Sequence, residues 1–450
     1  MTVPSSFDAV VIGAGPGGEA AVTRLSAAGL RTALVERELV GGECAYWACI
    51  PSKTLLRPAE AGAAAARAAG LSAPEQRWRE LASYRDFMVR HLDDSKQVED
   101  YRSEGVEVYR GEGRLGGAGI VEVAGETLRA KRIVLAAGSI PRLPAIAGLR
   151  ESGFWTNREA TNLGEIPRSV IVLGGGPVGM ELGQFLRRFG TSVTIVQDSP
   201  RLLGREEPRV SELISETLIG EGIDLRLGVE ASSVAPSKDG RTVALSDGAE
   251  VGARELLVAT GRTPRTEGLG LEGVGVELGP AGVKIDERCR AGEGIWAIGD
   301  ITGVMPFTHV AKYQARIACA DMTGAAVRAD YGSIPRVVFS DPEVAAVGLT
   351  EAEARERGIE VASARVELAE AIARPWTYER DPRGELGVLA DRRRGALVGA
   401  WAVSPLAGEW IHYAALAIKA QAPLELLRDT VAQFPTYCEG YLRAIEALEL

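Results

Sequence analysis

A strand, a glycine-rich turn and a helix follow one another twice in this sequence, and no other feature restricts the fold as strongly. In the first copy, residues 9–28 predict a buried parallel strand and an alanine-rich helix. The turn between them matches G-x-G-x-x-G through Gly13, Gly15 and Gly18. Such glycines let a pyrophosphate approach the backbone, and the N-terminus of the helix attracts it. The next strand ends at Glu36, whose carboxylate we expect to bind a ribose diol.

The second copy begins with an apolar strand over residues 169–173. Its turn glycines are Gly174, Gly176 and Gly179, and a further strand ends near Gln197. Two such sites in one chain imply two dinucleotides, or an enzyme that passes electrons between them.

The end of this second strand leaves the identity of its nucleotide open. Gln197 stands where the first copy has an acid, and a neutral side chain does not repel a 2′-phosphate. Asp198 could still bind a ribose diol, while Arg201 or Arg205 could pair with a phosphate or simply be solvated surface charge. The sequence therefore does not decide between NADH and NADPH.

Two cysteines, Cys44 and Cys49, lie shortly after the first turn in the run GGECAYWACIPSK. Five cysteines in 450 residues do not make a disulfide framework, so a close pair indicates catalytic thiols or a metal site. A zinc site is less favoured because no second close Cys/His pair exists. A disulfide needs Cα atoms within about 7 Å, whereas five residues along an ideal helix span about 8–9 Å. We therefore expect the helix start here to be distorted.

Charge and hydropathy exclude several classes of partner. The net charge of −10 argues against nucleic acid or an anionic membrane surface as partner. No apolar stretch reaches the roughly 20 residues that span a bilayer. The first twelve residues carry no Lys or Arg, which argues against a secretory signal and favours a cytoplasmic protein.

The order of these motifs resembles the class I pyridine nucleotide-disulfide oxidoreductases, which include dihydrolipoamide dehydrogenase, glutathione reductase and mercuric reductase. Residues 136–141 and 259–264 resemble the two ATG-type turns of this family, and residues 295–300 resemble its second FAD motif. Residues 335–343 and 408–412 resemble its dimerisation domain. The similarity covers nearly the whole chain.

The resemblance implies an α/β fold with two Rossmann-like dinucleotide-binding domains and a C-terminal α+β dimerisation domain. FAD would bind residues 1–143 and 263–331, NAD(P)H residues 144–262, and residues 332–450 would form a homodimer with shared active sites. The strand–helix pattern independently favours α/β for the nucleotide domains and α+β for the last third. The residues that the resemblance adds to the cofactor sites are Gly42, Lys53, Ala137, Gly138, Gly261, Gly299, Asp300 and His309.

The resemblance also implies a redox sequence. Electrons would pass from NAD(P)H through FAD to the Cys44–Cys49 pair and then to a small-molecule disulfide or another oxidant. Cys49 would be the thiolate beside the flavin, and Cys44 would attack the substrate. Lys53 would form an ion pair with Glu181 near flavin N5, where a cation stabilises the reduced flavin; a packing salt bridge is the alternative.

The largest departure from the family lies near the C-terminus. Phe434 replaces the histidine of a His-Pro-Thr run, although Glu439 matches the glutamate that orients this histidine. Phenylalanine cannot transfer a proton. Tyr437 or Cys438 could take part instead, or both could pack at the interface. The chain has three histidines, and each is more typical of a structural position than of a replacement base: His91, His309 and His412.

Smaller departures affect the two pockets. Tyr46 and Trp47 lie between the cysteines where the family has small residues, and they either shape the pocket or pack under the flavin. Pro177 replaces the tyrosine that gates the nicotinamide site. The missing histidine makes dihydrolipoamide dehydrogenase doubtful. The alternatives are a mercuric-reductase-like metal ion reductase, although a C-terminal vicinal cysteine pair is missing, and a quinone or dye reductase.

Overall fold

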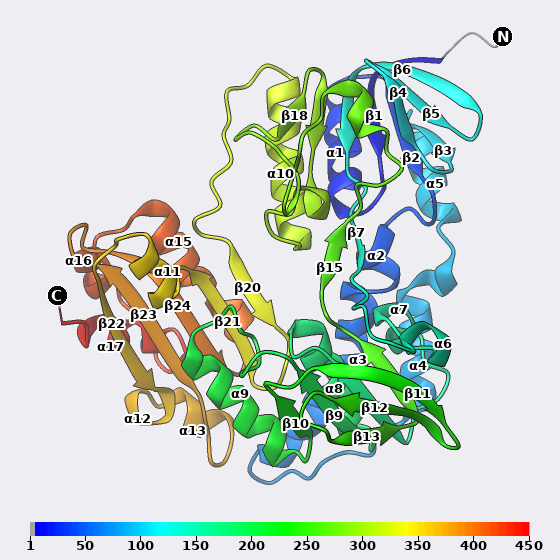
Figure 1. Cartoon of the computed structure of the whole chain (residues 1–450). Helices are drawn as coiled ribbons and strands as arrows, with labels where there is room; N and C mark the ends of the chain where they lie inside the picture. The colour runs from blue at the N-terminus through cyan, green and yellow to red at the C-terminus, as the bar shows by residue number, and fades with distance from the viewer. Residues whose placement is uncertain (1–4, 450) are drawn as a thin grey trace. The chain divides into compact units, whose positions relative to one another are not determined.

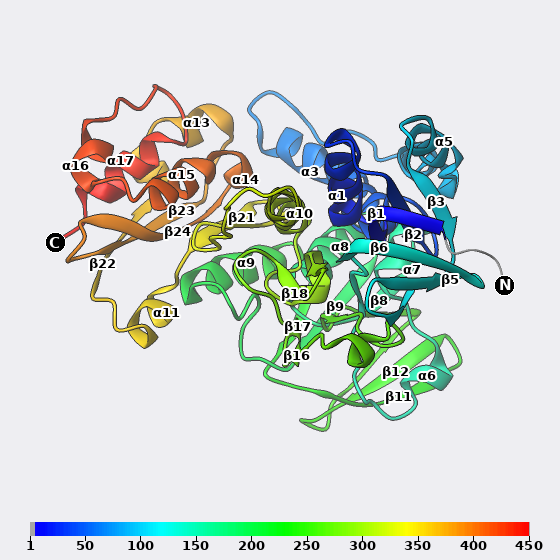
Figure 2. The same cartoon turned by 90° about the horizontal axis from the view of Figure 1, so that it is seen from above.

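The computed structural model describes residues 5–449, which form a mixed α/β protein (Figures 1 and 2). Its described part divides into two compact units. The first comprises residues through Pro51 together with Ser83–Arg142 and Arg262–Asp330, and the second comprises Ser52–Ala82, Leu143–Gly261 and Tyr331 onward. No helix within the described range is both long and apolar enough to cross a membrane.

The first unit is built on a sheet in the order β18-β19-β6-β1-β2-β3, in which the neighbours from β19 to β3 are parallel. Helices α1 (Pro16–Ala27) and α10 (Thr308–Met322) pack side by side on it and share a core with β1 (Figure 1). The fully buried apolar residues of β1 explain this strand's central place. The sheet strands are β1 (Ser5–Ile12), β2 (Thr32–Glu36), β3 (Glu107–Arg110), β6 (Glu126–Leu135), β18 (Arg290–Gly292) and β19 (Ile295–Ala297).

The second unit contains the second strand–turn–helix copy as a parallel sheet in the order β10-β9-β8-β14. Its helices are α8 (Pro177–Arg188), which follows the second glycine turn, and α9 (Pro208–Gly220). The strands are β8 (Ser169–Leu173), β9 (Ser192–Gln197), β10 (Asp224–Leu227) and β14 (Glu255–Val258).

The C-terminal part of this unit contains an antiparallel sheet in the order β20-β21-β24-β23-β22. Alternate residues of β21 enter different cores. Val344 and Ala346 pack with Val172 of β8, whereas Ala345 and Val347 pack with residues of α15 (His412–Ala420) and α17 (Glu439–Glu446). The strands are β20 (Pro335–Val338), β21 (Glu343–Gly348), β22 (Val361–Glu367), β23 (Glu385–Asp391) and β24 (Ala396–Ser404).

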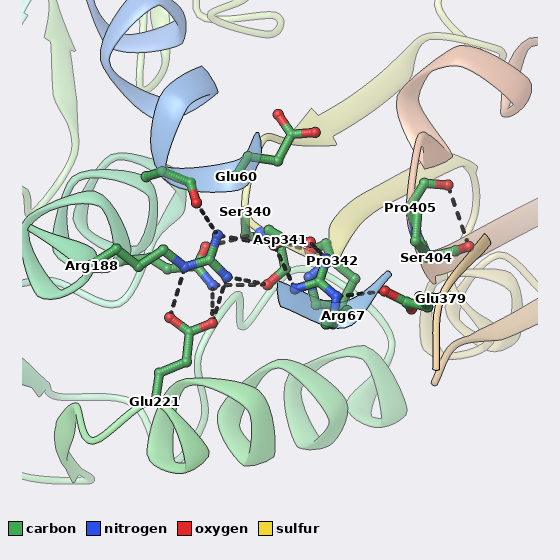
Figure 3. Close-up of polar contacts among 12 residues, drawn as sticks. Glu60, Arg67, Arg188, Glu221, Ser340, Asp341, Pro342, Glu379, Ser404 and Pro405 are labelled. Atoms are coloured by element: carbon green, nitrogen blue, oxygen red, sulfur yellow. Dashed lines mark hydrogen bonds and ion pairs between the residues drawn. The ribbon is translucent and has the colours of Figure 1, made fainter. Parts of the chain in front are cut away.

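A buried carboxylate joins these elements. Asp341, in the β20–β21 turn, pairs with Arg67 at 2.8 Å and with Arg188 at 2.9 Å, and both guanidinium groups point toward it (Figure 3). Arg188 also pairs with Glu221 at 2.6 Å, and Arg67 with Glu379. Arg67 ends α3 (Cys49–Arg67) and Arg188 ends α8, so the network ties two helices to the start of the C-terminal sheet.

Candidate functional site

The first glycine turn has the geometry that its sequence predicts. Gly13 has φ +101, and a Cβ there would lie 2.3 Å from the Ala136 carbonyl oxygen. A Cβ on Gly18 would lie 1.8 Å from the Gly13 oxygen, so helix and strand approach more closely than any side chain permits. Helix α1 starts at Pro16, as its fixed φ favours, with Gly15 as N-cap and no side chain capping its N–H groups.

Glu36 is buried at the end of β2, where it supports this turn. Its Oε2 accepts a hydrogen bond from Ala14 N at 2.7 Å, and its Oε1 accepts one from Glu38 N at 2.7 Å. The carboxylate predicted for a ribose therefore lies directly against the turn.

The second turn repeats this construction. Gly174 has φ +113, and a Cβ on Gly179 would lie 2.0 Å from the Gly174 oxygen. Gln197 Oε1 accepts a hydrogen bond from Gly175 N at 2.5 Å, across the same 22 residues that separate Ala14 from Glu36. Gln197 is thus the structural counterpart of Glu36.

Both turns fit the pyrophosphate of a dinucleotide. A Cβ on the second glycine of either motif, Gly15 or Gly176, would meet nothing within 4 Å, so the backbone there is open. Neither α1 nor α8 has a side-chain cap, which leaves first-turn N–H groups for a phosphate.

Asp300, another residue expected at the FAD site, lies beside the two-stranded pairing of β7 (Ser139–Pro141) with β15 (Arg262–Pro264). Ser139 Oγ donates to Asp300 Oδ2 at 2.6 Å, which fixes the carboxylate predicted to bind the ribityl chain. Gln314 accepts from Gly299 N at 2.6 Å. All four glycines that the resemblance adds to the cofactor sites have positive φ: Gly42 (+59), Gly138 (+71), Gly261 (+113) and Gly299 (+78).

The cysteine loop lies on the first glycine turn. Gly41 N donates to the Ala14 carbonyl at 2.8 Å. A Cβ on Gly42 would lie 2.8 Å from Gly15 Cα, so these two backbones touch without side chains between them. The thiol-bearing segment is therefore anchored to the place predicted for the pyrophosphate.

The helix that carries the thiols is interrupted, as the Cα-spacing argument predicts. Helix α2 (Gly42–Tyr46) contains Cys44 and ends before Trp47, and α3 begins at Cys49. One hydroxyl, that of Thr308 at the start of α10, reaches both sulfurs: it donates to Cys44 Sγ at 3.2 Å and lies 3.5 Å from Cys49 Sγ. Neither cysteine is in a disulfide, and both are partly exposed.

The Cys44 thiol is a weaker acid than an ordinary cysteine. The hydrogen bond with Cys49, followed by burial, raises the pKa of the Cys44 thiol, and the Thr308 hydroxyl opposes this rise.

Tyr46 packs in the interior. Its ring is fully buried, and its hydroxyl donates to the Val40 carbonyl at 3.2 Å and accepts from Arg90 at 3.3 Å. The Trp47 ring lies against it, with centroids 5.7 Å apart. Of the two roles considered for Tyr46, the geometry supports packing.

The second unit contains the predicted ion pair. Lys53 Nζ lies 2.7 Å from Glu181 Oε2. The other oxygen of Glu181 accepts from Phe339 N at 2.9 Å, and the Lys53 ammonium lies 4.7 Å from the centre of the Phe339 ring. Glu181 is 5% exposed, so the carboxylate of this ion pair is largely shielded from water.

Near the C-terminus, Phe434 is 74% exposed. Glu439 accepts a hydrogen bond from Thr436 N at 3.2 Å, so the glutamate binds backbone in a position where the family has a histidine to orient. Tyr437 is buried and stacks on Trp410, with centroids 6.0 Å apart at 9°. Burial raises the pKa of Tyr437 and of Cys438, which makes either a weaker acid.

The three histidines lie on three separate elements. His309 stacks on Phe307 with centroids 5.1 Å apart, next to Thr308. His412 begins α15, and His91 lies in a turn with φ +52.

Sequence reasoning missed three side chains of these clusters: Thr308, Ser139 and Phe339. Thr308 and Ser139 each lie beside a residue that was selected, His309 and Gly138, which is the only signal that pointed to them. Phe339 lies in the segment that resembles the dimerisation domain, far from the cysteines in sequence.

Comparisons with known proteins agree with this geometry. Residues 7–315 match the model of the pyridine nucleotide-disulphide oxidoreductase family. Residues 334–445 match the model of the dimerisation domain of the same family. A dihydrolipoyl dehydrogenase of Thermus scotoductus is 35% identical over 98% of this chain and 97% of its own. A mercuric reductase of Lysinibacillus sphaericus is 34% identical over 97% of this chain and 81% of its own. A solved Cu(II) complex of the HOCl-induced flavoprotein disulfide reductase RclA from Escherichia coli has a TM-score of 0.88 at 27% identity, covering 98% and 99% of the two chains.

Proposed function

Because the chain belongs to the pyridine nucleotide-disulphide oxidoreductase family, we propose that it reduces a small-molecule disulfide through Cys44 and Cys49. It is a flavoprotein oxidoreductase, and members of its family use FAD and NAD(P)H. The substrate is the part that this proposal adds.

The main support for this proposal is the attachment of the cysteine loop, residues 41–49, to the first glycine turn. The Gly41–Ala14 hydrogen bond and the Gly42–Gly15 backbone contact support a thiol pair held beside a dinucleotide. A pair of inert structural cysteines would not need this close contact or a shared Thr308 hydroxyl.

Bound FAD supplies a two-electron carrier between NAD(P)H and the Cys44–Cys49 disulfide. After reduction, the Thr308 hydroxyl turns from Cys44 to donate to the thiolate of Cys49, and Cys44 loses its proton to solvent as it attacks the substrate. Attack on one substrate sulfur forms a mixed disulfide and releases the other sulfur as a thiolate. Cys49 then attacks Cys44, which releases the second substrate thiol and restores the Cys44–Cys49 disulfide. Lys53, paired with Glu181, would place a cation at the reduced cofactor.

The substrate class follows from the missing base. Phe434 cannot protonate the first leaving thiolate, and burial raises the pKa of its neighbours Tyr437 and Cys438. A disulfide whose thiol product has a low pKa leaves without such help, because thiols of lower pKa leave faster. We therefore expect aromatic or otherwise low-pKa disulfides to be better substrates than lipoamide or glutathione disulfide.

The assignment of domains and partners belongs to the same proposal. FAD would bind residues 1–143 and 263–331, and NAD(P)H residues 144–262. A homodimer would form through residues 332–450, where large apolar side chains are exposed: Leu416, Val431 and Phe434. The cytoplasm is the compartment that keeps such thiols reduced.

Anaerobic titration of the FAD-loaded protein tests the proposal. We expect NADH or NADPH to produce a long-wavelength thiolate–flavin absorption band, and Cys49→Ser to abolish it while FAD stays bound. Turnover of a disulfide such as 5,5′-dithiobis(2-nitrobenzoate) should then require both cysteines. Persistence of the band in Cys49→Ser would disprove the role given to Cys49.

Reduction of a metal ion is the second candidate. Phe434-Pro435 and 34% identity to a mercuric reductase favour it. Within residues 5–449, however, no group of three or more His, Cys, Asp or Glu side chains is arranged to hold a metal ion. Turnover of Hg(II), but of no disulfide, in the same assay would favour this candidate.

A further inference from the structure

We infer that the second glycine turn selects NADH over NADPH, and that Asp198 is the residue that determines this choice. The inference rests on the proposed function, because it names the reductant that enters the site of that function.

Asp198 is held in a fixed orientation at the carboxyl end of β9. The Gln197 amide donates to Asp198 Oδ1 at 2.7 Å, and Ser199 N donates to the same oxygen at 2.7 Å. Gln197 itself is anchored, since its Oε1 accepts from Gly175 N at 2.5 Å. Neither of the hydrogen bonds to Asp198 uses Oδ2, and the side chain is exposed.

Comparison with the first turn shows which residue carries the strand-end carboxylate in the second site. There the strand ends in Glu36, whose two oxygens accept from Ala14 N and Glu38 N. In the second turn the neutral Gln197 makes the equivalent bond to the turn, and the negative charge has moved one residue along, to Asp198. The second site therefore keeps a carboxylate at the strand end, where a ribose diol is bound in this fold.

Arg201, one of the two arginines that could favour a 2′-phosphate, is already engaged. Arg201 Nη1 donates to the Glu206 carbonyl at 2.7 Å and to Ser211 Oγ at 3.4 Å, and Nη2 donates to the Gly204 carbonyl at 2.9 Å. These bonds close the loop that follows β9. They hold the guanidinium toward its own loop, so a phosphate would have to compete with them or use only the remaining N–H donors of Arg201.

Charge and hydrogen bonding at Asp198 therefore both favour NADH over NADPH. The 2′-hydroxyl of NADH can donate to Asp198 Oδ2. A 2′-phosphate offers no comparable donor at neutral pH and carries about −1.5 to −2 charges, which the carboxylate repels. We expect NAD⁺ to bind at least about tenfold tighter than NADP⁺, which is about 1.4 kcal/mol.

Isothermal titration of the full-length, FAD-loaded protein with NAD⁺ and with NADP⁺ measures this preference. In Asp198→Asn we expect NADP⁺ to bind about tenfold tighter and NAD⁺ to change by less than about threefold, and the gain should shrink at high salt. The KM values for NADH and NADPH should move in the same ratio. Asp198→Ser provides a second variant should the first fail to fold.

Two controls separate the local effect from net charge and from the remaining arginine. Asp224→Asn removes one negative charge from the neighbouring strand β10, where Asp224 pairs in register with Thr194, three residues before Gln197. It should leave the NAD⁺/NADP⁺ ratio unchanged. Arg205→Gln should also leave it unchanged, because Arg205 is exposed and lies farther along the loop.

Equal binding of the two nucleotides by the natural protein, or an equal effect of Asp198→Asn on both, would overturn the inference. A selective loss of NADP⁺ binding in Arg205→Gln would also overturn it. A yellow, FAD-loaded protein that binds neither nucleotide would refute the proposed function as well, and would be distinguished in this way from a failure of selectivity alone.

Discussion

Thr308→Val removes a single hydroxyl from beside both redox sulfurs and keeps the branched shape of the side chain. The hydroxyl lies 3.2 Å from Cys44 Sγ and 3.5 Å from Cys49 Sγ. A hydrogen bond to the charged form of a group lowers its pKa, so its removal must raise the pKa of the thiolate. Hydrogen bonds to charged groups contribute about 1.5–3 kcal/mol. Sulfur is a weak acceptor and the site is partly exposed, so we take the lower end, which equals about one pKa unit.

The assay follows the thiolate directly. In a Cys44→Ser background, Cys49 is the only thiol of the pair, and the pH midpoint of the long-wavelength band reports its ionisation in the FAD-loaded protein. We expect Thr308→Val to raise this midpoint by about one unit. Thr308→Ser keeps the hydroxyl and should restore the original midpoint. If the valine and serine variants titrate together, Thr308 does not act through its hydroxyl and the assignment is wrong.

Two further changes test other parts of the molecule. Phe434→His should increase the rate with lipoamide or glutathione disulfide by at least about tenfold, because a positioned acid or base typically contributes about 10²–10⁴-fold. An unchanged rate would show that the missing base does not limit these substrates. Burial raises the pKa of Glu343 to about 7 from 4.5, although Gly408 N donates to it. The folded state therefore binds the extra proton between these values, and stability falls as pH rises through this window. In urea denaturation, Glu343→Gln should match the natural protein at pH 5 and exceed it at pH 8 by about 2 kcal/mol; equal stabilities at both pH values would contradict the burial argument.

The nucleotide-binding turns could be predicted from sequence because their chemistry is local. Gly13 and Gly174 need positive φ, and a strand-end side chain must accept from the turn, whether it is Glu36 or Gln197. Counting residues from the glycine turn identifies Gln197 as the counterpart of Glu36. The structure agrees, because each side chain accepts a hydrogen bond from a backbone N–H of its own turn.

The remainder depends on contacts between distant segments. Thr308 reaches Cys44 across 264 residues, and no periodicity or spacing encodes that approach. The guanidinium of Arg201 could have faced solvent, a phosphate or its own loop, and only the folded loop decides among them. The domain limits and the roles of individual site residues stay predictions.

The double-sided C-terminal sheet limits how this protein can be divided or recombined. One face of β21 completes the core of the nucleotide-binding sheet, and Asp341 neutralises Arg67 and Arg188 from outside that sheet. A fragment ending before residue 332 would expose an apolar surface and leave two arginines without their shared carboxylate. Residues 332–450 are therefore not an exchangeable module: a chimera with a relative must carry the matching turn, both arginines and the facing core residues together.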